Sequence, residues 1–219
     1  RIEWRGDELR LNIDDFEPWS QRRVRGQIRV QAAHRFAPAV DMAANGQHHW
    51  FPVAPASRAI VEFERPDLRF EGVAYHDMNQ GQRALEDDFV EWDWSRLTPP
   101  GEHERGRITY DVVTRHGGPT HHRRAFEFGP RGLRTAPTEG TELVASEKGF
   151  WGVQRKPVAD LDTRATHLRA LEDSPFYTRS VIETQLYGEP HVGVHEALRM
   201  DRFVSPITQA MLPFRIRRR

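Results

Sequence analysis

Cysteine is absent from this sequence of 219 residues. Its absence excludes disulfide bonds, thiol nucleophiles and thiolate metal ligands in the chain. A chain without disulfides suits a reducing compartment, so we expect a cytoplasmic location. Long apolar runs are also missing, because none approaches the roughly 20 residues that a membrane-spanning helix requires. The sequence therefore predicts no transmembrane segment in this chain.

The chain lacks net charge as well, with 32 Lys and Arg against 32 Asp and Glu. A zero net charge gives no overall field that would favour nucleic acid or an acidic ligand. Lysine is scarce, since only Lys148 and Lys156 are present, and we interpret this as a genomic preference for arginine. The basic stretch 215–219 is interpreted as a solvated tail, with contact to an anionic surface as its alternative.

Apolar and polar residues alternate along many short segments, which is typical of half-buried antiparallel strands. The segments are 9–13, 24–30, 60–63, 68–70, 89–94, 108–112, 122–128 and 178–186. Prolines such as Pro52, Pro55 and Pro66 are expected to mark turns and sheet edges between them. The pattern predicts an all-β fold with one short C-terminal helix, in which Ser205 caps a helical segment that begins at Pro206.

The alternating pattern stops at residues 97–101, Leu-Thr-Pro-Pro-Gly. The sequence therefore predicts two β domains, residues 1–96 and 97–219, with a hairpin turn at 117–118 in the second. The chain starts at Arg1 instead of Met, within strand-like sequence. We therefore expect the first domain to be truncated at its N-terminus, and a signal peptide or anchor on an upstream piece stays open.

Two short stretches, 46–52 and 75–81, combine aromatic and titratable residues. Side chains along a strand alternate between its two faces. His48 and Trp50 therefore share one face, and Tyr75 and Asp77 share another. If both faces point into one apolar cavity, an imidazole, an indole, a phenol and a carboxyl meet there. This set of groups predicts a proton-transfer site with an aromatic wall.

Asp77 has two interpretations on this pattern. It either supports the turn-like stretch 78–81 through local backbone hydrogen bonds, or it is a desolvated carboxyl that stays protonated near neutral pH. A protonated carboxyl of this kind is a general acid. Tyr75 and Trp50 are equally open, because they are either core aromatics or rings that stabilise a developing cation by up to about 2 kcal/mol each.

Further candidates lie outside these two stretches. Trp92 and Trp94 share one strand face, and they either pack the core or line a tunnel for a long apolar ligand. Glu196 lies in the middle of the apolar face formed by residues 192–200, where it either pairs with an arginine or is a second pocket carboxyl. The acidic stretch 86–88 is interpreted as a solvated loop.

Motifs for metals, nucleotides and serine hydrolases are missing from the sequence. His48 and His49 are adjacent in a predicted strand, so their side chains point to opposite faces and do not share an ion, and the same holds for His121 and His122. No Glu or His stands at ligand spacing beside them, so we predict no metal site. A G-x-S-x-G elbow and a glycine-rich phosphate loop are both absent.

An ordered set of motifs resembles the carotenoid 1,2-hydratase (hydroxyneurosporene synthase) family. The motifs are His48-x-Trp50, Tyr75-x-Asp77, Trp92-Asp93-Trp94-Ser95-Arg96, Leu171-Glu172-Asp173-Ser174-Pro175-Phe176-Tyr177-x-Arg179-Ser180, His195-Glu196, Asp201-Arg202-Phe203 and Gln209-Ala210-Met211-Leu212-Pro213-Phe214-Arg215. Each motif alone is weak, but the ordered set is specific. The resemblance covers nearly the whole chain and is dense in 46–96 and 171–216. His76 departs from the family pattern, in which Phe is typical, and this leaves the substrate open.

The resemblance implies two lipocalin-like β domains and a cofactor-independent hydro-lyase. It implies addition of water to the terminal 1,2 double bond of acyclic carotenoids such as neurosporene and lycopene, which gives a 1-hydroxy carotenoid. An apolar substrate also favours peripheral contact with a membrane. The essential residues of the family, with Asp77 as the proton donor, correspond here to His48, Trp50, Tyr75 and Asp77. We then predict that Trp50 and Tyr75 shield the cation, and that His48 holds the attacking water and takes the proton that it releases. The residues that we then expect to bind substrate are Trp92, Trp94 and Glu196.

Two other classes of protein stay open on the sequence. A non-catalytic lipocalin-like carrier of an apolar ligand needs the tunnel of Trp92 and Trp94 but no acid. A β-sandwich glycosidase would use Asp77 and Glu196 as its pair of carboxylates. The carrier would bind a carotenoid without adding water to it, and the glycosidase would cleave chromogenic glycosides.

Overall fold

A six-stranded antiparallel sheet forms the first part of the chain in this computed structural model, which describes residues 1–17, 20–37, 39–42, 46–115 and 121–212. Its strand order is β1-β2-β3-β5-β4, and β6 pairs with the other edge of β5. The strands are β1 (Ile2–Arg5), β2 (Glu8–Phe16), β3 (Arg23–Ala32), β4 (Val40–Asp41), β5 (His48–Arg65) and β6 (Leu68–Gly81).

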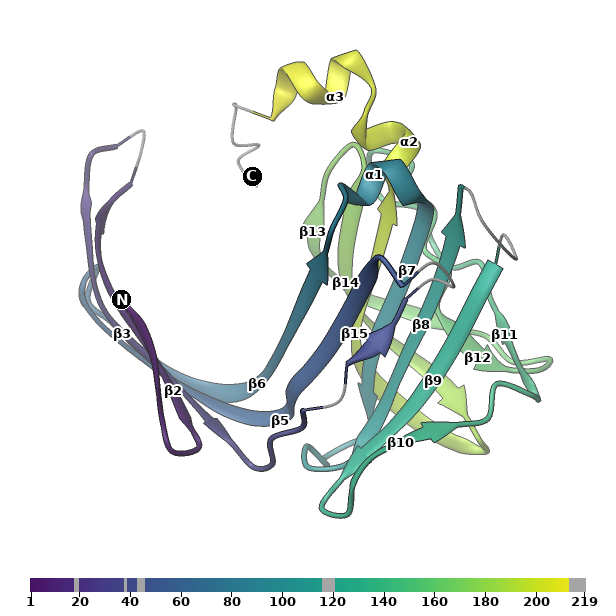
Figure 1. Cartoon of the computed structure of the whole chain (residues 1–219), viewed down its shortest axis with the longest axis horizontal. Helices are drawn as coiled ribbons and strands as arrows, with labels where there is room; N and C mark the ends of the chain where they lie inside the picture. The colour runs from purple at the N-terminus through teal and green to yellow at the C-terminus, as the bar shows by residue number, and fades with distance from the viewer. Residues whose placement is uncertain (18–19, 38, 43–45, 116–120, 213–219) are drawn as a thin grey trace.

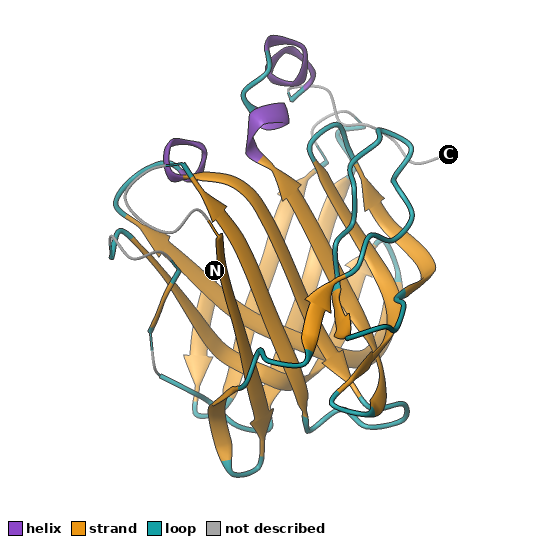
Figure 2. Ribbon diagram, turned by 90° about the vertical axis from the view of Figure 1, so that its right-hand side faces the viewer, coloured by secondary structure: helices purple, strands orange, loops and turns teal. Residues whose placement is uncertain are grey.

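A seven-stranded antiparallel sheet forms the second part, in the order β10-β9-β8-β7-β15-β14-β13 (Figures 1 and 2). Its strands are β7 (Phe89–Thr98), β8 (Gly106–Thr114), β9 (His121–Gly129), β10 (Gly132–Ala136), β13 (Thr166–Asp173), β14 (Tyr177–Leu186) and β15 (Glu189–Arg199). A small two-stranded sheet, β11 (Thr141–Leu143) and β12 (Val158–Asp160), accompanies it. The predicted all-β, antiparallel class is confirmed. Both larger sheets are open at their ends in the described part of the chain, so neither is a closed barrel.

The hairpin of β5 and β6 belongs to the first sheet and packs against the second sheet. In Figure 1 the strands β1 to β3 curve away from the second sheet, while the first part of β5 and the last part of β6 lie against β7 to β9. Buried residues of both sheets form one core, in which Trp50 from β5 packs with Trp92, Tyr110 and Phe126 from the second sheet. The space between the sheets is therefore lined by residues from both parts of the chain.

Strand β5 corrects the prediction that Pro52 and Pro55 separate short strands. Both prolines lie inside one strand of 18 residues, His48–Arg65. The pairing with β6 shifts register between Phe51 and Ala54 and again between Ala54 and Ser57. Proline has no N–H to donate to a strand partner, and such irregular positions are where a sheet tolerates it. The prolines therefore bend the strand and do not end it.

The helices of the described residues are short, and they lie at one end of the sheets (Figure 1). The predicted helix is confirmed as α3 (Pro206–Met211), where the Ser205 hydroxyl accepts a hydrogen bond from the Thr208 N–H. Helices α1 (Leu85–Asp88) and α2 (Met200–Phe203) were not predicted, because four residues are too few to show helical periodicity. No helix in the described ranges has the length and apolarity needed to cross a membrane.

The chain passes from the first sheet to the second through α1, between Gly81 and Phe89. The predicted domain boundary after Arg96 lies near the end of β7, so the division into domains stays a prediction. The predicted turn at 117–118 and the basic stretch 215–219 lie outside the described residues.

Candidate functional site

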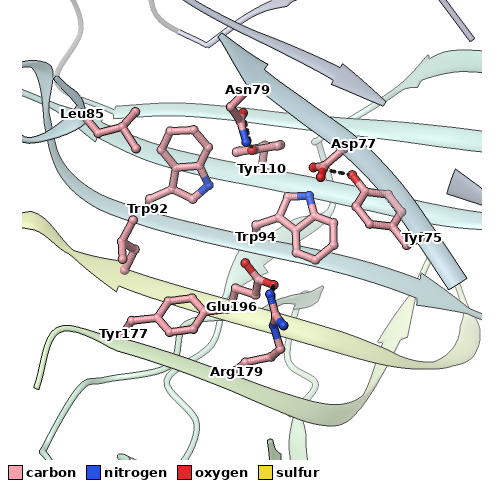
Figure 3. Close-up of a pocket in the computed structure, with 11 residues that line it drawn as sticks. Tyr75, Asp77, Asn79, Leu85, Trp92, Trp94, Tyr110, Tyr177, Arg179 and Glu196 are labelled. Atoms are coloured by element: carbon pink, nitrogen blue, oxygen red, sulfur yellow. Dashed lines mark hydrogen bonds and ion pairs between the residues drawn. The ribbon is translucent and has the colours of Figure 1, made fainter. Parts of the chain in front are cut away.

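A cavity of about 320 Å³ opens between β6 of the first sheet and strands β7, β8, β14 and β15 of the second (Figure 3). Its wall combines five aromatic residues with two carboxyl groups. The lining residues are Tyr75, Asp77, Asn79, Leu85, Trp92, Trp94, Tyr110, Tyr177, Arg179, Glu196 and Leu198. Of the four groups predicted to share one cavity, Tyr75 and Asp77 line this one, and His48 and Trp50 do not. The cavity requires both sheets.

Asp77 is held on one side by two neutral donors. The indole N–H of Trp50 donates to Asp77 Oδ2 at 2.8 Å, and the hydroxyl of Tyr75 donates to the same oxygen at 2.7 Å. The other oxygen, Oδ1, accepts no hydrogen bond from the described residues. The carboxyl group is therefore fixed in orientation, while one of its oxygens stays available to the cavity.

The register of β5 and β6 explains why these groups meet. Trp50 pairs with Asn79 across the hairpin, so the face of Trp50 is the face of Asn79, Asp77 and Tyr75. The Trp50 side chain is fully buried, with its ring centroid 5.0 Å from that of Tyr110. Trp50 thus contributes its N–H to Asp77 from behind the wall, and it does not present its ring face to the cavity, as cation shielding would require.

Two phenols of the cavity remain protonated donors. Burial raises the pKa of Tyr75 well above its usual value, and the nearby Asp77 carboxylate adds to this shift. Burial also raises the pKa of Tyr110, again with a contribution from Asp77. The Tyr110 hydroxyl donates to Asn79 Oδ1 at 3.4 Å. Both hydroxyl groups therefore favour a nearby negative charge without carrying one themselves.

Trp92 and Trp94 face the cavity, as the tunnel interpretation requires. The Trp94 ring lies 5.0 Å from Tyr75, and the Trp92 ring lies 4.9 Å from Tyr110, centroid to centroid. A second cavity, of about 690 Å³, shares Tyr75, Trp94, Arg179 and Glu196 with the first. Most of its remaining lining comes from 73–74, 96–103, Leu171 and 192–194. The two cavities therefore adjoin at two aromatic rings and one ion pair.

Glu196 satisfies both interpretations that the sequence left open. Its Oε1 accepts a hydrogen bond from Arg179 Nε at 2.8 Å and forms an ion pair with Nη2 at 2.7 Å, and its side chain lines both cavities. Arg179 faces Glu196 directly across the pair β14–β15. The sequence analysis did not assign Arg179 to the site. The available signal was its position in the predicted strand 178–186, whose pairing with the strand of Glu196 could not be predicted.

His48 does not line the cavity formed by Asp77 and Tyr75. Its side chain is 3% exposed, and Nε2 lies 2.8 Å from Asp88 Oδ2. Asp88 is itself buried, so the interpretation of 86–88 as a solvated loop is wrong at this residue, because α1 turns its carboxyl inward. His49 instead contacts Asp41 at 2.8 Å, as expected for adjacent strand residues on opposite faces. The role of His48 as a base stays a prediction.

Arg96 ties the two sheets together beside the larger cavity. Its Nε donates to the carbonyl oxygen of Pro55 at 2.7 Å, and Nη2 donates to that of His103 at 3.3 Å. Burial lowers the pKa of Arg96 to about 10. The carbonyl of Pro55 is available because the strand is irregular there. The irregular part of β5 therefore helps to position the sheets around the cavity.

A second polar cluster lies on the other face of β7, where Ser95 Oγ is 3.0 Å from His195 Nδ1. Asp93 follows, at 3.5 Å from His195 Nε2 and 2.9 Å from Arg199 Nη1. These residue types suggest a hydrolase triad, but Ser95 and His195 are each 1% exposed and Asp93 is 5% exposed. Asp93 also accepts a hydrogen bond from the Lys156 N–H. The cluster anchors the segment before β12 and has no access for a substrate.

The described part of the chain is an all-β fold of antiparallel sheets. A solved structure with this fold is that of a Nitrosomonas europaea protein provisionally named AttH. Its TM-score is 0.55 at 13% sequence identity, over 90% of this chain and 67% of that one. At this identity the likeness concerns the fold alone.

The model of the family described as carotenoid hydratase CrtC matches residues 1–219, and the chain belongs to this family. Named relatives are the acyclic carotenoid 1,2-hydratases of Thiocapsa roseopersicina, 38% identical over 99% of this chain, and of Rubrivivax gelatinosus, 33% identical over 100%. The match spans 52% and 53% of the length of these two relatives. The chain thus spans about half the length of each of these two relatives.

Proposed function

We propose that the protein containing this chain adds water to the terminal 1,2 double bond of an acyclic carotenoid. The observation that carries the proposal is Asp77, a carboxyl group oriented by Trp50 and Tyr75 at the wall of an aromatic cavity. Membership of the carotenoid hydratase family supports the substrate class. Lycopene and neurosporene are the substrates that we would test first.

Asp77, in its protonated form, donates H⁺ to C2 of the terminal double bond. The electron pair of the double bond forms the new C–H bond, and the positive charge remains on C1. This direction of addition is favoured because C1 carries two methyl groups and its cation is tertiary. The hydrogen bonds from Trp50 and Tyr75 stabilise the carboxylate that is left behind, since both end on Asp77 Oδ2.

The aromatic wall stabilises the cation between proton transfer and water addition. Rings of Tyr75, Trp92 and Trp94 line the cavity that holds Asp77. An aromatic face near a desolvated cation contributes up to about 2 kcal/mol.

The sizes of the two cavities support a long apolar substrate. The smaller, about 320 Å³, has room for the end of a chain, and the adjoining cavity of about 690 Å³ receives the part that follows. A single well-formed ligand pocket typically has 300–1,000 Å³. The reacting end would therefore lie at Asp77 while the polyene runs along Trp94 toward the larger cavity.

A labelling experiment separates this hydratase from a carrier. The purified protein is incubated with detergent-solubilised lycopene in ¹⁸O-labelled water, and the carotenoid is analysed by mass spectrometry. We expect a 1-hydroxy product whose hydroxyl oxygen carries the label. Binding of lycopene without labelled product would favour a non-catalytic carrier and contradict the proposal.

A further inference from the structure

We propose that Glu196, and not His48, takes the proton from water when the hydroxyl group forms. This inference rests on the proposed function, because it assigns the second half of the same reaction. Water addition to a cation needs an acceptor for the proton that the water loses. That acceptor must reach the cavity in which the cation forms.

The cavity offers a narrow choice of proton acceptors. Among its described lining residues, Asp77 and Glu196 are the carboxylates, and no histidine is present. His48 is held elsewhere, because its ring contacts Asp88 on one side and packs 4.9 Å from the Phe89 ring. A Cβ at Gly81 would lie 2.5 Å from His48 Nδ1, so β6 also closes over this nitrogen. His48 would have to leave these contacts to hold a water molecule in the cavity.

The two cavity carboxyls have different surroundings. Asp77 receives hydrogen bonds from an indole and a phenol, both neutral donors. Glu196 instead pairs with the guanidinium of Arg179 at 2.7 and 2.8 Å. A guanidinium partner favours the charged form of a carboxyl group. Two carboxyls in unlike environments are the usual arrangement for a division into acid and base.

Their positions also suit addition across one bond. Figure 3 shows Asp77 and Glu196 on opposite sides of Trp94, with Asp77 on β6 and Glu196 on β15. Glu196 and Trp94 are direct cross-strand partners, so the carboxyl lies beside the ring along which the substrate end would pass. A carbon chain in this cavity would therefore have the acid on one side and the acceptor on the other.

The proton balance closes with these two residues. Asp77 gives a proton to C2, water forms the C1–O bond, and one O–H bond of the bound water breaks as its proton passes to Glu196. The protonated alcohol that precedes this transfer is a very strong acid, so a carboxylate in contact with it is basic enough to accept the proton. Glu196 then returns a proton, through solvent, to Asp77, and the net change is the addition of one water.

Oxygen exchange in the alcohol product isolates the step assigned to Glu196. The 1-hydroxy carotenoid is incubated with protein in ¹⁸O-labelled water, and label is measured in the recovered alcohol. Exchange requires loss and return of water at C1, but no proton transfer at C2. Asp77→Asn should therefore lower hydration of lycopene by about 10²–10⁴-fold and keep oxygen exchange, whereas Glu196→Gln should lower both by about 10²–10⁴-fold.

Two further variants sharpen the comparison. Glu183→Gln changes an exposed glutamate on the neighbouring strand β14 and should leave hydration and exchange unchanged. His48→Ala should keep oxygen exchange if Glu196 is the acceptor. Exchange at wild-type rate in Glu196→Gln, or its loss in a folded His48→Ala, would overturn the inference.

Glu196→Gln leaves Arg179 without its partner, so folding is checked by circular dichroism and a chemical rescue is added. In Glu196→Ala, formate should enter the vacated space and restore part of the exchange. A folded variant that binds carotenoid but is not rescued would contradict the assignment. Wild-type protein with neither hydration nor exchange would instead show that the proposed function itself is wrong.

Discussion

Asp77 uses one oxygen for two hydrogen bonds and leaves the other open to the cavity. Trp50 and Tyr75 both donate to Oδ2, so in the proposed reaction they would stabilise the carboxylate that develops as the proton leaves. Each donor should therefore act on the rate of proton transfer more than on substrate binding. The two donors can be removed one at a time without removing the aromatic ring at either position.

Trp50→Phe and Tyr75→Phe should each slow hydration about tenfold. Each change removes one hydrogen bond to a developing charge, worth about 1.5 kcal/mol, and 1.36 kcal/mol corresponds to a factor of ten in rate. The measurement is the initial rate of 1-hydroxy carotenoid formation at saturating substrate, with the fold checked by circular dichroism. A Trp50→Phe variant as fast as wild type would show that the N–H has no catalytic role.

All four tyrosines should stay protonated in the folded protein when free tyrosine would ionise. Burial raises the pKa of Tyr75, Tyr110, Tyr177 and Tyr187 above the usual value of 10.0. Above pH 10.0 the unfolded chain therefore binds fewer protons than the native chain, so stability falls as the pH rises. Phenolate absorption should appear together with alkaline unfolding. Phenolate formed near pH 10 with unchanged circular dichroism would contradict this expectation.

The sequence predicted which residues share a strand face, but it did not predict which of them are covered by the second sheet. Strand alternation placed Trp50 on one face and Tyr75 and Asp77 on another, and left open whether the two faces meet. The hairpin register and the hydrogen bonds to Asp77 show that these three side chains do meet. The alternation of side chains gives the face of each residue, but it does not show which part of a strand packs against another sheet. For that reason His48, on the same face as Trp50, lies beside Asp88 and does not line the cavity.

At the scale of elements, the hairpin of β5 and β6 determines the geometry of the site. Its register shifts near Pro52 and Pro55 lie between the part of β5 that pairs with β3 and the part that packs against the second sheet, and β5 bends there. Proline was interpreted as a strand end because regular pairing excludes it, whereas an irregular position accepts it. The length of β5 could not be predicted, since it depends on partners that are distant in sequence.

Gly81, the last residue of β6, should not tolerate a side chain. A Cβ there would lie 2.5 Å from His48 Nδ1, so alanine would displace the imidazole from Asp88. We expect Gly81→Ala to lower the free energy of unfolding by about 1–3 kcal/mol, as overpacking does. Gly72→Ala is the matched control, because it lies on the same strand with nothing within 4 Å of the added Cβ.

Denaturant unfolding of both variants measures this difference. The control should remain within about 1 kcal/mol of the wild type, in either direction. Equal stabilities for Gly81→Ala and Gly72→Ala would show that the contact of His48 with β6 is loose. A loose contact would also weaken the argument that His48 is kept out of the cavity.

At the scale of the whole molecule, the cavity exists because two sheets face each other. Asp77 comes from the first sheet, while Trp92, Trp94 and Glu196 come from the second. Composition and alternation predicted the all-β class, since strand patterns are local. The contact between the sheets joins residues that are distant in the sequence. For this reason the sequence analysis did not assign Arg96, Tyr110 and Arg179 to the site, although the structure places them there.

Family membership extends this picture to the reaction, since the chain matches the carotenoid hydratase model along its full length. It spans about half of the Thiocapsa and Rubrivivax relatives, so hydration is a proposal for the protein that contains it. The central claim of that proposal is that the Asp77 carboxyl is the proton donor. It can be tested by replacing one carboxyl oxygen of Asp77 with an amide nitrogen, because asparagine preserves the shape of the side chain.

The most direct test is the rate of lycopene hydration by Asp77→Asn. The asparagine oxygen can still accept the hydrogen bonds of Trp50 and Tyr75, so the fold and the carotenoid binding should be retained. Removal of the acid should lower the rate of 1-hydroxy product formation by about 10²–10⁴-fold, and Asp77→Ala should be at least as slow. Hydration near the wild-type rate by either variant would contradict the account.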